Sequence, residues 1–238
     1  MTLYSNKMSK LKVATIVCIL LLLGGIQAKA QVGETRNIFS IGGNLAVNMN
    51  TVSFTPTIKQ NSYMGMAGGF TVRYISEKYF AMICGAQLEI NFSQRGWEEK
   101  FEEGSTNSYK RSMNYVEIPF LAHIAFGSEP TGFQFFIHAG PQIGILLSEK
   151  ESFSDPFDPT HTVNYQYGKK VNNKFEYGIA AGLGIEWKTK KAGNFLLEGR
   201  YYFGLSDFYS NSKKDYFDRS AHGTISIRLS YLFDLVKK

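Results

Sequence analysis

The chain has 238 residues and a formal charge of +6, but its first 30 residues hold four lysines and no acidic residue, so the remainder carries only +2. This small excess, without a basic stripe, argues against a nucleic-acid-binding protein. Of the two cysteines, Cys18 lies in an N-terminal apolar run, and the single remaining thiol of Cys84 excludes a disulfide within the mature domain.

The N-terminal segment has the layout of a secretory signal peptide. An apolar run covers residues 13–26, and Ala28 and Ala30 give the small-x-small pattern of a cleavage site. The basic start before this run is formed by Lys7, Lys10 and Lys12. An uncleaved anchor is the alternative, but a spanning helix needs about 20 apolar residues, and the run is shorter. The sequence therefore predicts a cleaved signal peptide over residues 1–30 and one mature domain over residues 31–238.

Eight segments of the mature domain alternate between apolar and small or polar residues, which is the pattern of β-strands. In residues 175–187, the clearest case, Ile179 and Leu183 fall on one face. Gly182 and Glu186 fall on the other. The eight segments are residues 39–49, 64–75, 80–92, 109–126, 133–148, 175–187, 195–205 and 224–233.

The strands of a soluble sandwich or a lipocalin-like barrel also alternate between apolar and polar residues. The prediction that the outer face contacts lipid therefore rests on three further features. The segments are about 10 to 18 residues long, whereas ordinary strands average about 5–6 and a tilted spanning strand needs about 9–11. The less apolar face is rich in glycine and alanine, which suits a narrow lumen. Aromatic residues gather near segment ends, as in the interfacial girdles of membrane barrels. These residues are Tyr74, Tyr79, Phe80, Phe126, Phe133 and Trp187.

The connections between the segments alternate strictly in length. The short ones are residues 76–79, 127–132 and 188–192, and the long ones are residues 50–63, 96–108, 149–173 and 206–221. In bacterial outer membrane barrels, short turns face the periplasm and long loops face the exterior. We therefore predict an all-β fold, an eight-stranded antiparallel transmembrane up-and-down β-barrel, with short periplasmic turns, long extracellular loops and both mature termini in the periplasm.

Seven charged residues fall on the inward face of these segments. Because eight strands leave an interior that side chains fill, and buried charge is tolerated only when it is paired, we expect a salt-bridged plug. A proton or ion path is the alternative. The predicted lumen charge network consists of Arg73, Glu89, Glu117, Glu186, Glu198, Arg200 and Arg228.

Pro119 and Pro141 interrupt two neighbouring segments, and reflection through the turn at residues 127–132 places them almost opposite one another. Proline cannot donate a strand hydrogen bond. We therefore predict a local bulge shared by the two strands, with a lateral opening towards the membrane as the alternative.

The sequence indicates no catalytic, cofactor-binding or metal site. His123 and His138 face inward on neighbouring strands without a carboxylate or cysteine at metal-ligand spacing, so we expect them to form lumen hydrogen bonds. The long loop at residues 149–173 is the candidate recognition loop, because aromatic residues on a polar external loop suit protein or glycan contacts. The same residues could equally fold down as a lid. They are Phe153, Phe157, Tyr165 and Tyr167.

Three motifs resemble the PorT-like outer membrane β-barrel family of Bacteroidetes, whose members are often called porin-like. They are Ser93-Gln94-Arg95-Gly96, Val116-Glu117-Ile118-Pro119-Phe120 and Ala139-Gly140-Pro141-Gln142-Ile143-Gly144. The resemblance covers essentially the whole mature chain. It implies an eight-stranded outer membrane barrel without known enzymatic chemistry, and the namesake of the family is associated with type IX protein secretion.

Three functional hypotheses follow from the sequence and the resemblance. The first is a non-enzymatic structural or interaction component of the outer membrane, with a role in type IX secretion or envelope assembly. The second is a narrow porin-like channel for small solutes or ions, and the third is a lipid-modifying barrel enzyme. The expected partners are outer membrane lipid and envelope or secretion-machinery proteins, without nucleic acid and without a cofactor.

Overall fold

The computed structural model describes residues 33–155, 166–212 and 215–236. Its strands belong to one compact unit that begins at Glu34. The predicted signal peptide, with its cleavage residues Ala28 and Ala30, lies outside the described residues, as do Phe157 and Tyr165 of the candidate recognition loop. Within the described ranges, no helix has the length and apolar character that a membrane crossing requires.

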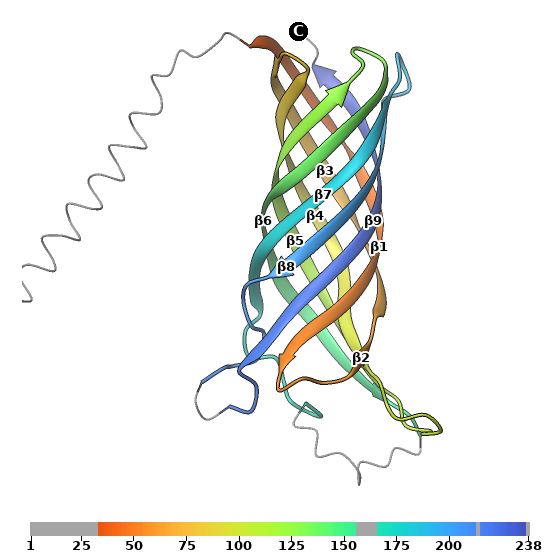
Figure 1. The fold of residues 1–238 in the computed structure, drawn as a ribbon, viewed down its shortest axis with the longest axis vertical. Helices are drawn as coiled ribbons and strands as arrows, with labels where there is room; N and C mark the ends of the chain where they lie inside the picture. The colour runs from red at the N-terminus through yellow and green to blue at the C-terminus, as the bar shows by residue number, and fades with distance from the viewer. Residues whose placement is uncertain (1–32, 156–165, 213–214, 237–238) are drawn as a thin grey trace, which may run out of the picture. The chain divides into compact units, whose positions relative to one another are not determined.

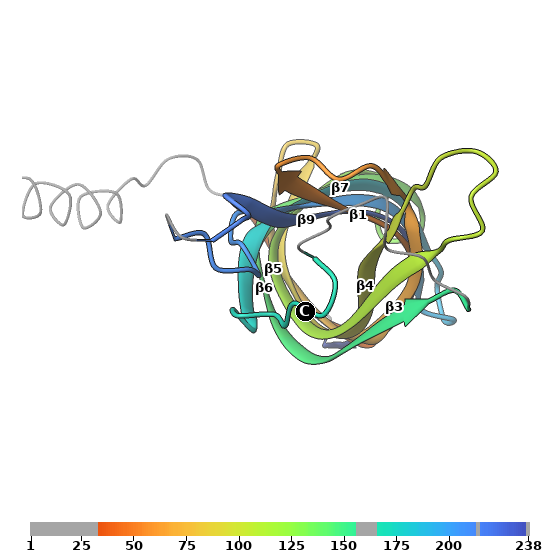
Figure 2. The ribbon, with the colours of Figure 1, turned by 90° about the horizontal axis from the view of Figure 1, so that it is seen from below.

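Eight long strands of the described chain pair antiparallel in sequence order and close into a ring (Figures 1 and 2). The long strands are β1 (Glu34–Thr55), β3 (Tyr63–Tyr79), β4 (Met82–Glu99), β5 (Tyr109–Gly127), β6 (Gly132–Phe153), β7 (Phe175–Lys188), β8 (Asn194–Gly204) and β9 (Arg219–Val236). The ring closes where the first long strand, β1, pairs with the last, β9. A two-residue strand, β2 (Gln60–Asn61), pairs with the end of β4. This architecture confirms the predicted fold.

The barrel has two different ends. At one end, here called the turn end, short connections join β3 to β4, β5 to β6 and β7 to β8. The start of β1 and the finish of β9 lie at this end too, since Phe39 pairs with Val236 (Figure 1, top). The opposite end, here called the loop end, carries the longer connections (Figure 1, bottom).

Several strands extend further towards the loop end than the sequence predicts. β1 continues to Thr55, β4 to Glu99 and β6 to Phe153, so the predicted long loops are in part β-structure. The reason is visible where Lys110 pairs with both Glu98 and Ser152, because the outward face there is polar while the ladder continues. The predicted boundaries of the long loops are therefore wrong, since they followed the end of the apolar pattern rather than the end of pairing.

The barrel wall is apolar outside and polar inside. Outward side chains such as Leu45, Phe70 and Leu229 are 72%, 77% and 63% exposed, respectively. Near the turn end, outward aromatic rings stand side by side on successive strands, with Trp187 lying 6.1 Å from Phe133 and 5.9 Å from Phe195 between ring centroids. Large apolar side chains facing outward, with an aromatic row at one edge, are typical of a wall that contacts lipid.

The predicted bulge at Pro119 and Pro141 is wrong. β5 and β6 keep the same register on both sides of the prolines, and their register shift lies elsewhere, between Asn114 and Tyr115. The prolines interrupt the ladders instead, because each lacks the donor that a ladder needs. Paired residues are missing between β4 and β5 beside Pro119, and between β5 and β6 beside Pro141.

Closure of the ring depends on close backbone contact between β1 and β9. A Cβ atom on Gly42 would lie 1.8 Å from the carbonyl oxygen of Tyr231 in β9. A Cβ atom on the next residue, Gly43, would come no closer than 3.6 Å to another residue, at the carbonyl oxygen of Gly69. Gly42 is therefore required where the two strands meet, whereas Gly43 has space for a larger residue.

Candidate functional site

The polar interior begins near the turn end with an ion pair that crosses the barrel. The guanidinium of Arg73 donates two hydrogen bonds of 2.7 Å to the carboxylate of Glu186. Arg73 lies on β3 and Glu186 on β7, which are four places apart in the ring of eight long strands. Both side chains are buried, so this pair spans the lumen between opposite walls.

A second ion pair crosses the middle of the barrel. Arg200 on β8 donates to Glu89 on β4, at 2.7 and 2.9 Å, and these strands are also four places apart. Arg200 also binds Glu198 at 2.8 Å. Arg228 approaches Glu89 at 3.6 Å and donates to Asn44. The four charges therefore form one buried network in which every carboxylate faces an arginine.

Towards the loop end, a third cluster centres on Arg95. Its Nε donates to Glu117 at 2.6 Å and its Nη1 donates to Glu176 at 3.2 Å. Glu176 also accepts a hydrogen bond from Tyr115 and lies 2.9 Å from Nδ1 of His222. This cluster joins strands on three sides of the lumen.

The structure places all seven predicted lumen residues inside, each at most 5% exposed, and gives each an oppositely charged neighbour. Sequence reasoning missed Arg95, Glu176 and His222 as members of these networks. In β4 every second residue faces inward. If this alternation is continued three residues beyond the predicted strand end at Phe92, it predicts that Arg95 faces inward. Among the described residues, the buried charged side chains are balanced, with six cations and six carboxylates.

His123 and His138 form the expected lumen contact. Nδ1 of His123 lies 2.8 Å from Nε2 of His138, and Nδ1 of His138 lies 3.2 Å from Glu198. The described part of the chain holds no group of three or more histidine, cysteine, aspartate or glutamate side chains arranged for a metal ion.

An aromatic cap fills the lumen at the loop end, beyond the charged clusters. Trp97 packs against Phe54 and Phe208, with ring centroids 5.1 and 5.6 Å away, and its Nε1 donates to Gln166 at 2.9 Å. Buried members of the cap are Val52, Phe54, Trp97, Tyr109, Met113, Tyr115, Leu146, Val171, Phe208, Tyr209 and Phe217. Residues from the β8–β9 loop thus turn inward and cover the polar interior.

Arg111 fastens the cap to the neighbouring β6 extension. It donates to Glu151 at 2.8 Å and to the hydroxyl of Tyr209 at 3.0 Å, and it pairs with Glu149. Burial raises the pKa of Tyr209 well above its ordinary value, although the charge of Arg111 opposes the shift. Tyr209 therefore stays a neutral hydrogen-bonding group at physiological pH.

The two described members of the candidate recognition loop belong to the cap's edge. The rings of Phe153 and Tyr167 lie 5.1 and 4.7 Å from the ring of Tyr109, and the hydroxyl of Tyr167 donates to Glu99 at 2.7 Å. Both rings therefore pack at the edge of the cap, with Phe153 at the end of β6 and still 44% exposed.

Comparison with known proteins returns several bacterial outer membrane proteins of low sequence identity. A search of solved structures finds Ail, the attachment invasion locus protein of Yersinia pestis, in complex with the heparin analogue sucrose octasulfate (14% identity, 84% of this chain and 99% of that chain, TM-score 0.39). It also finds the outer membrane protein OprG of Pseudomonas aeruginosa (13%, 84% and 98%, TM-score 0.45) and Neisserial surface protein A (11%, 82% and 97%, TM-score 0.42).

A comparison with curated proteins finds no significant match. The family model described as "Outer membrane protein beta-barrel domain" matches residues 29–210, which is most of the chain. With its closed eight-stranded ring, apolar outer wall and polar interior, the chain belongs to this family of outer membrane β-barrel proteins.

Proposed function

We propose that this chain is a closed, non-enzymatic outer membrane barrel that acts as a structural or interaction component of the envelope, with a PorT-like role in type IX secretion or envelope assembly. The observation that carries the proposal is the obstruction of the lumen. The Arg73–Glu186 and Glu89–Arg200 pairs cross it, and the aromatic cap covers its loop end. A barrel filled in this way serves through its surface rather than through a pore.

The proposed orientation places the turn end in the periplasm and the loop end outside the cell. It is supported by the contrast between short and long connections, which is the usual arrangement in bacterial barrels. Cleavage after Ala30 would then leave both mature termini in the periplasm. N-terminal sequencing of the protein from the outer membrane fraction is expected to begin at Gln31.

Conductance in planar bilayers tests the closed lumen. The purified barrel is expected to produce no stable step under conditions in which a general porin conducts. A stable ohmic step that changes when Arg200 or Arg228 is replaced by a neutral residue would contradict the proposal and favour a narrow channel. The folded state of each preparation is checked by its shifted migration on gels before boiling.

The secretion role is tested in a clean deletion strain, by comparing its surface and secreted proteome with that of the parent. Loss of many exported proteins, with precursors retained in the periplasm, is the expected result for a type IX component. An unchanged secretome would contradict that role. Altered abundance of other outer membrane proteins in the same strain would instead support the role in envelope assembly.

A further inference from the structure

At the loop end, the barrel wall is shorter at β7 and β8 than at the strands on either side. β6 continues to Phe153, but its ladder with β7 ends where Ile145 pairs with Phe175. On the other side, β1 and β9 stay paired as far as Thr55 and Arg219. The β7–β8 ladder itself reaches only Gly178 and Gly204. The loop end is therefore notched at these two strands.

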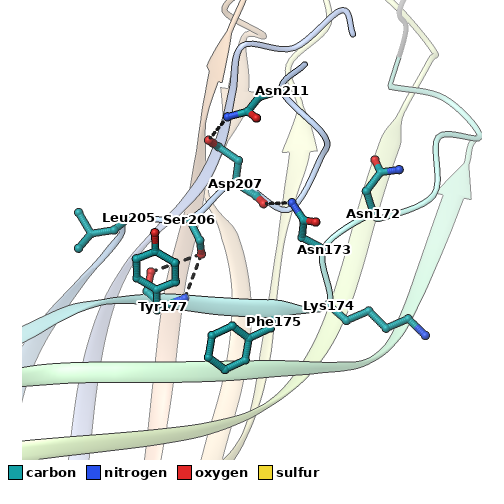
Figure 3. A pocket seen from close by; sticks show the side chains of 9 residues that line it. All are labelled: Asn172, Asn173, Lys174, Phe175, Tyr177, Leu205, Ser206, Asp207 and Asn211. Carbon is teal, nitrogen blue, oxygen red and sulfur yellow. Dashed lines mark hydrogen bonds between the residues drawn. The ribbon is translucent and has the colours of Figure 1, made fainter. Parts of the chain in front are cut away.

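A groove of about 780 Å³ lies in this notch, here called the notch groove (Figure 3). Its apolar part is formed by the outward side chains of Phe175, Tyr177 and Leu205, each about half exposed at the edge of the apolar wall. Its polar part comes from two loops that meet above them, at residues 172–174 and 206–211. The groove thus combines an apolar side with a polar side.

Hydrogen bonds hold the two loops of the notch groove together. The side chain of Asn173 donates to the backbone carbonyl of Asp207 at 2.8 Å, and the backbone N–H of Tyr177 donates to Oγ of Ser206 at 2.9 Å (Figure 3). Asn211 donates to the carboxylate of Asp207 at 3.1 Å. The polar groups that border the groove are therefore held in place before any ligand arrives, which lowers the entropic cost of binding.

Several polar groups that line the groove remain available to a ligand. The side-chain amide nitrogen of Asn172, the side-chain carbonyl oxygen of Asn173 and the ammonium of Lys174 have no hydrogen-bond or ion-pair partner among the described residues. They supply one donor, one acceptor and one cation. Neutral amides that both donate and accept match sugar hydroxyls, and the ammonium matches a phosphate.

We propose that the notch groove binds a phosphorylated glycolipid of the outer leaflet, with its acyl chain along Phe175, Tyr177 and Leu205 and its sugar headgroup at the polar loops. The assignment rests on the proposed orientation, which puts the loop end outside. At that level of the membrane the groove lies across the boundary between hydrocarbon and headgroups, so its occupant is amphiphilic. The side-chain amides of Asn172 and Asn173 favour a hydroxyl-rich headgroup over the headgroup of a phospholipid.

Native mass spectrometry of the purified, folded barrel in detergent tests this proposal with lipid A as the probe. Lys174→Glu is expected to weaken lipid A binding about tenfold, as expected for loss of a charged hydrogen bond. The matched control is Lys190→Glu, which makes the same change on the exposed β7–β8 turn at the other end of the barrel. Tyr177→Ala tests the apolar side of the groove. Its control is Tyr201→Ala, which removes another outward ring, nearer the turn end on β8.

Equal weakening by Lys174→Glu and Lys190→Glu would overturn the site. Equally tight binding of phosphatidylglycerol and lipid A would overturn the glycolipid assignment. Equally tight binding of lipid A and its deacylated sugar would overturn the claim that the ligand is a membrane lipid. Dimers that bind lipid A only after they dissociate would show a second copy of the chain as the occupant of the groove and would overturn the proposal too. Because the assay measures neither conductance nor secretion, a barrel that binds lipid A but conducts would contradict only the proposed function.

Discussion

At the scale of single residues, Arg95 illustrates how a narrow barrel accommodates a buried charge. Its guanidinium pairs with Glu117 and Glu176 and lies over the ring of Tyr202, 4.2 Å from the centroid. Several acceptors and an aromatic face thus replace the water that the cation loses. Removal of one partner leaves part of this charge unpaired, which is costly in a medium without water.

Glu117→Leu is expected to destabilise the folded barrel by about 3–5 kcal/mol, the usual effect of breaking a buried ion pair. Glu117 also accepts a hydrogen bond from Gln142, which loses its partner as well. The measurement is the temperature at which the folded band disappears on gels. Glu103→Leu, in an exposed loop, serves as the control. An unchanged temperature for Glu117→Leu would contradict the structural role of the network.

Strand parity accounts for how much of the interior could be predicted. The inward position of Glu186 or Arg228 follows from alternation within an apolar segment, and the structure buries both. Which partner each charge takes could not be predicted, because Arg73 and Glu186 lie on strands that meet only across the closed lumen. His222 was missed because it precedes the apolar part of its strand, where the alternation gives no signal.

At the scale of elements, the closing pair of strands is sensitive to a single methyl group. Gly42→Val is expected to prevent close pairing of β1 and β9, because its Cβ would collide with the backbone of Tyr231. The measurement is loss of the heat-modifiable folded band after refolding in detergent. Gly43→Ala should retain that band, because its Cβ has space. Normal folding of Gly42→Val would show that the two strands can separate without loss of the barrel.

The β5–β6 turn is joined to two other strands by Glu129. Its carboxylate binds Arg36 of β1 and Lys78 of β3, each at 3.2 Å. Partial burial raises the pKa of Glu129, but the hydrogen bonds from Arg36 and Lys78 outweigh it, so the pKa lies below its ordinary value. The ionised form is thus favoured in the folded state.

The stabilisation from Glu129 is therefore present above the unfolded pKa of glutamate, about 4.3, and is lost as the pH falls through the lower folded pKa. Glu129→Gln is expected to lower stability at neutral pH by at most about 1 kcal/mol, because the cluster is partly exposed. The difference from the unmodified chain should disappear in acid. Denaturant titrations at several pH values measure this, and a difference that persists at low pH would contradict the assignment.

The elements themselves were largely predictable, whereas their ends towards the loops were not. Alternation identifies a strand while one face contacts lipid, as at Leu45 and Val47 in β1. Beyond that band the polarity of the two faces reverses: Val52 and Phe54 face inward into the aromatic cap, while polar residues such as Ser53 and Thr55 face outward as pairing continues. A prediction that follows an apolar outward face therefore ends the strand too early.

At the scale of the whole molecule, the proposed orientation predicts which end can be reached from outside the cell. In a Cys84→Ser background, Thr106→Cys in the β4–β5 loop is expected to react with a membrane-impermeant maleimide on intact cells. Lys190→Cys in the β7–β8 turn should react only after the outer membrane is permeabilised. Both positions are exposed, so access rather than burial decides the outcome. The reverse pattern would invert the orientation.

The ion pairs that cross the lumen also bear on how the barrel assembles. Arg73 and Glu186 sit four strands apart, so they meet only when the sheet curls and β1 reaches β9. In an open sheet their charges stay hydrated on the face that later lines the lumen, and hydrated charges resist entry into hydrocarbon. Chain closure and membrane insertion are thereby linked, since only the closed ring presents an entirely apolar surface to the bilayer.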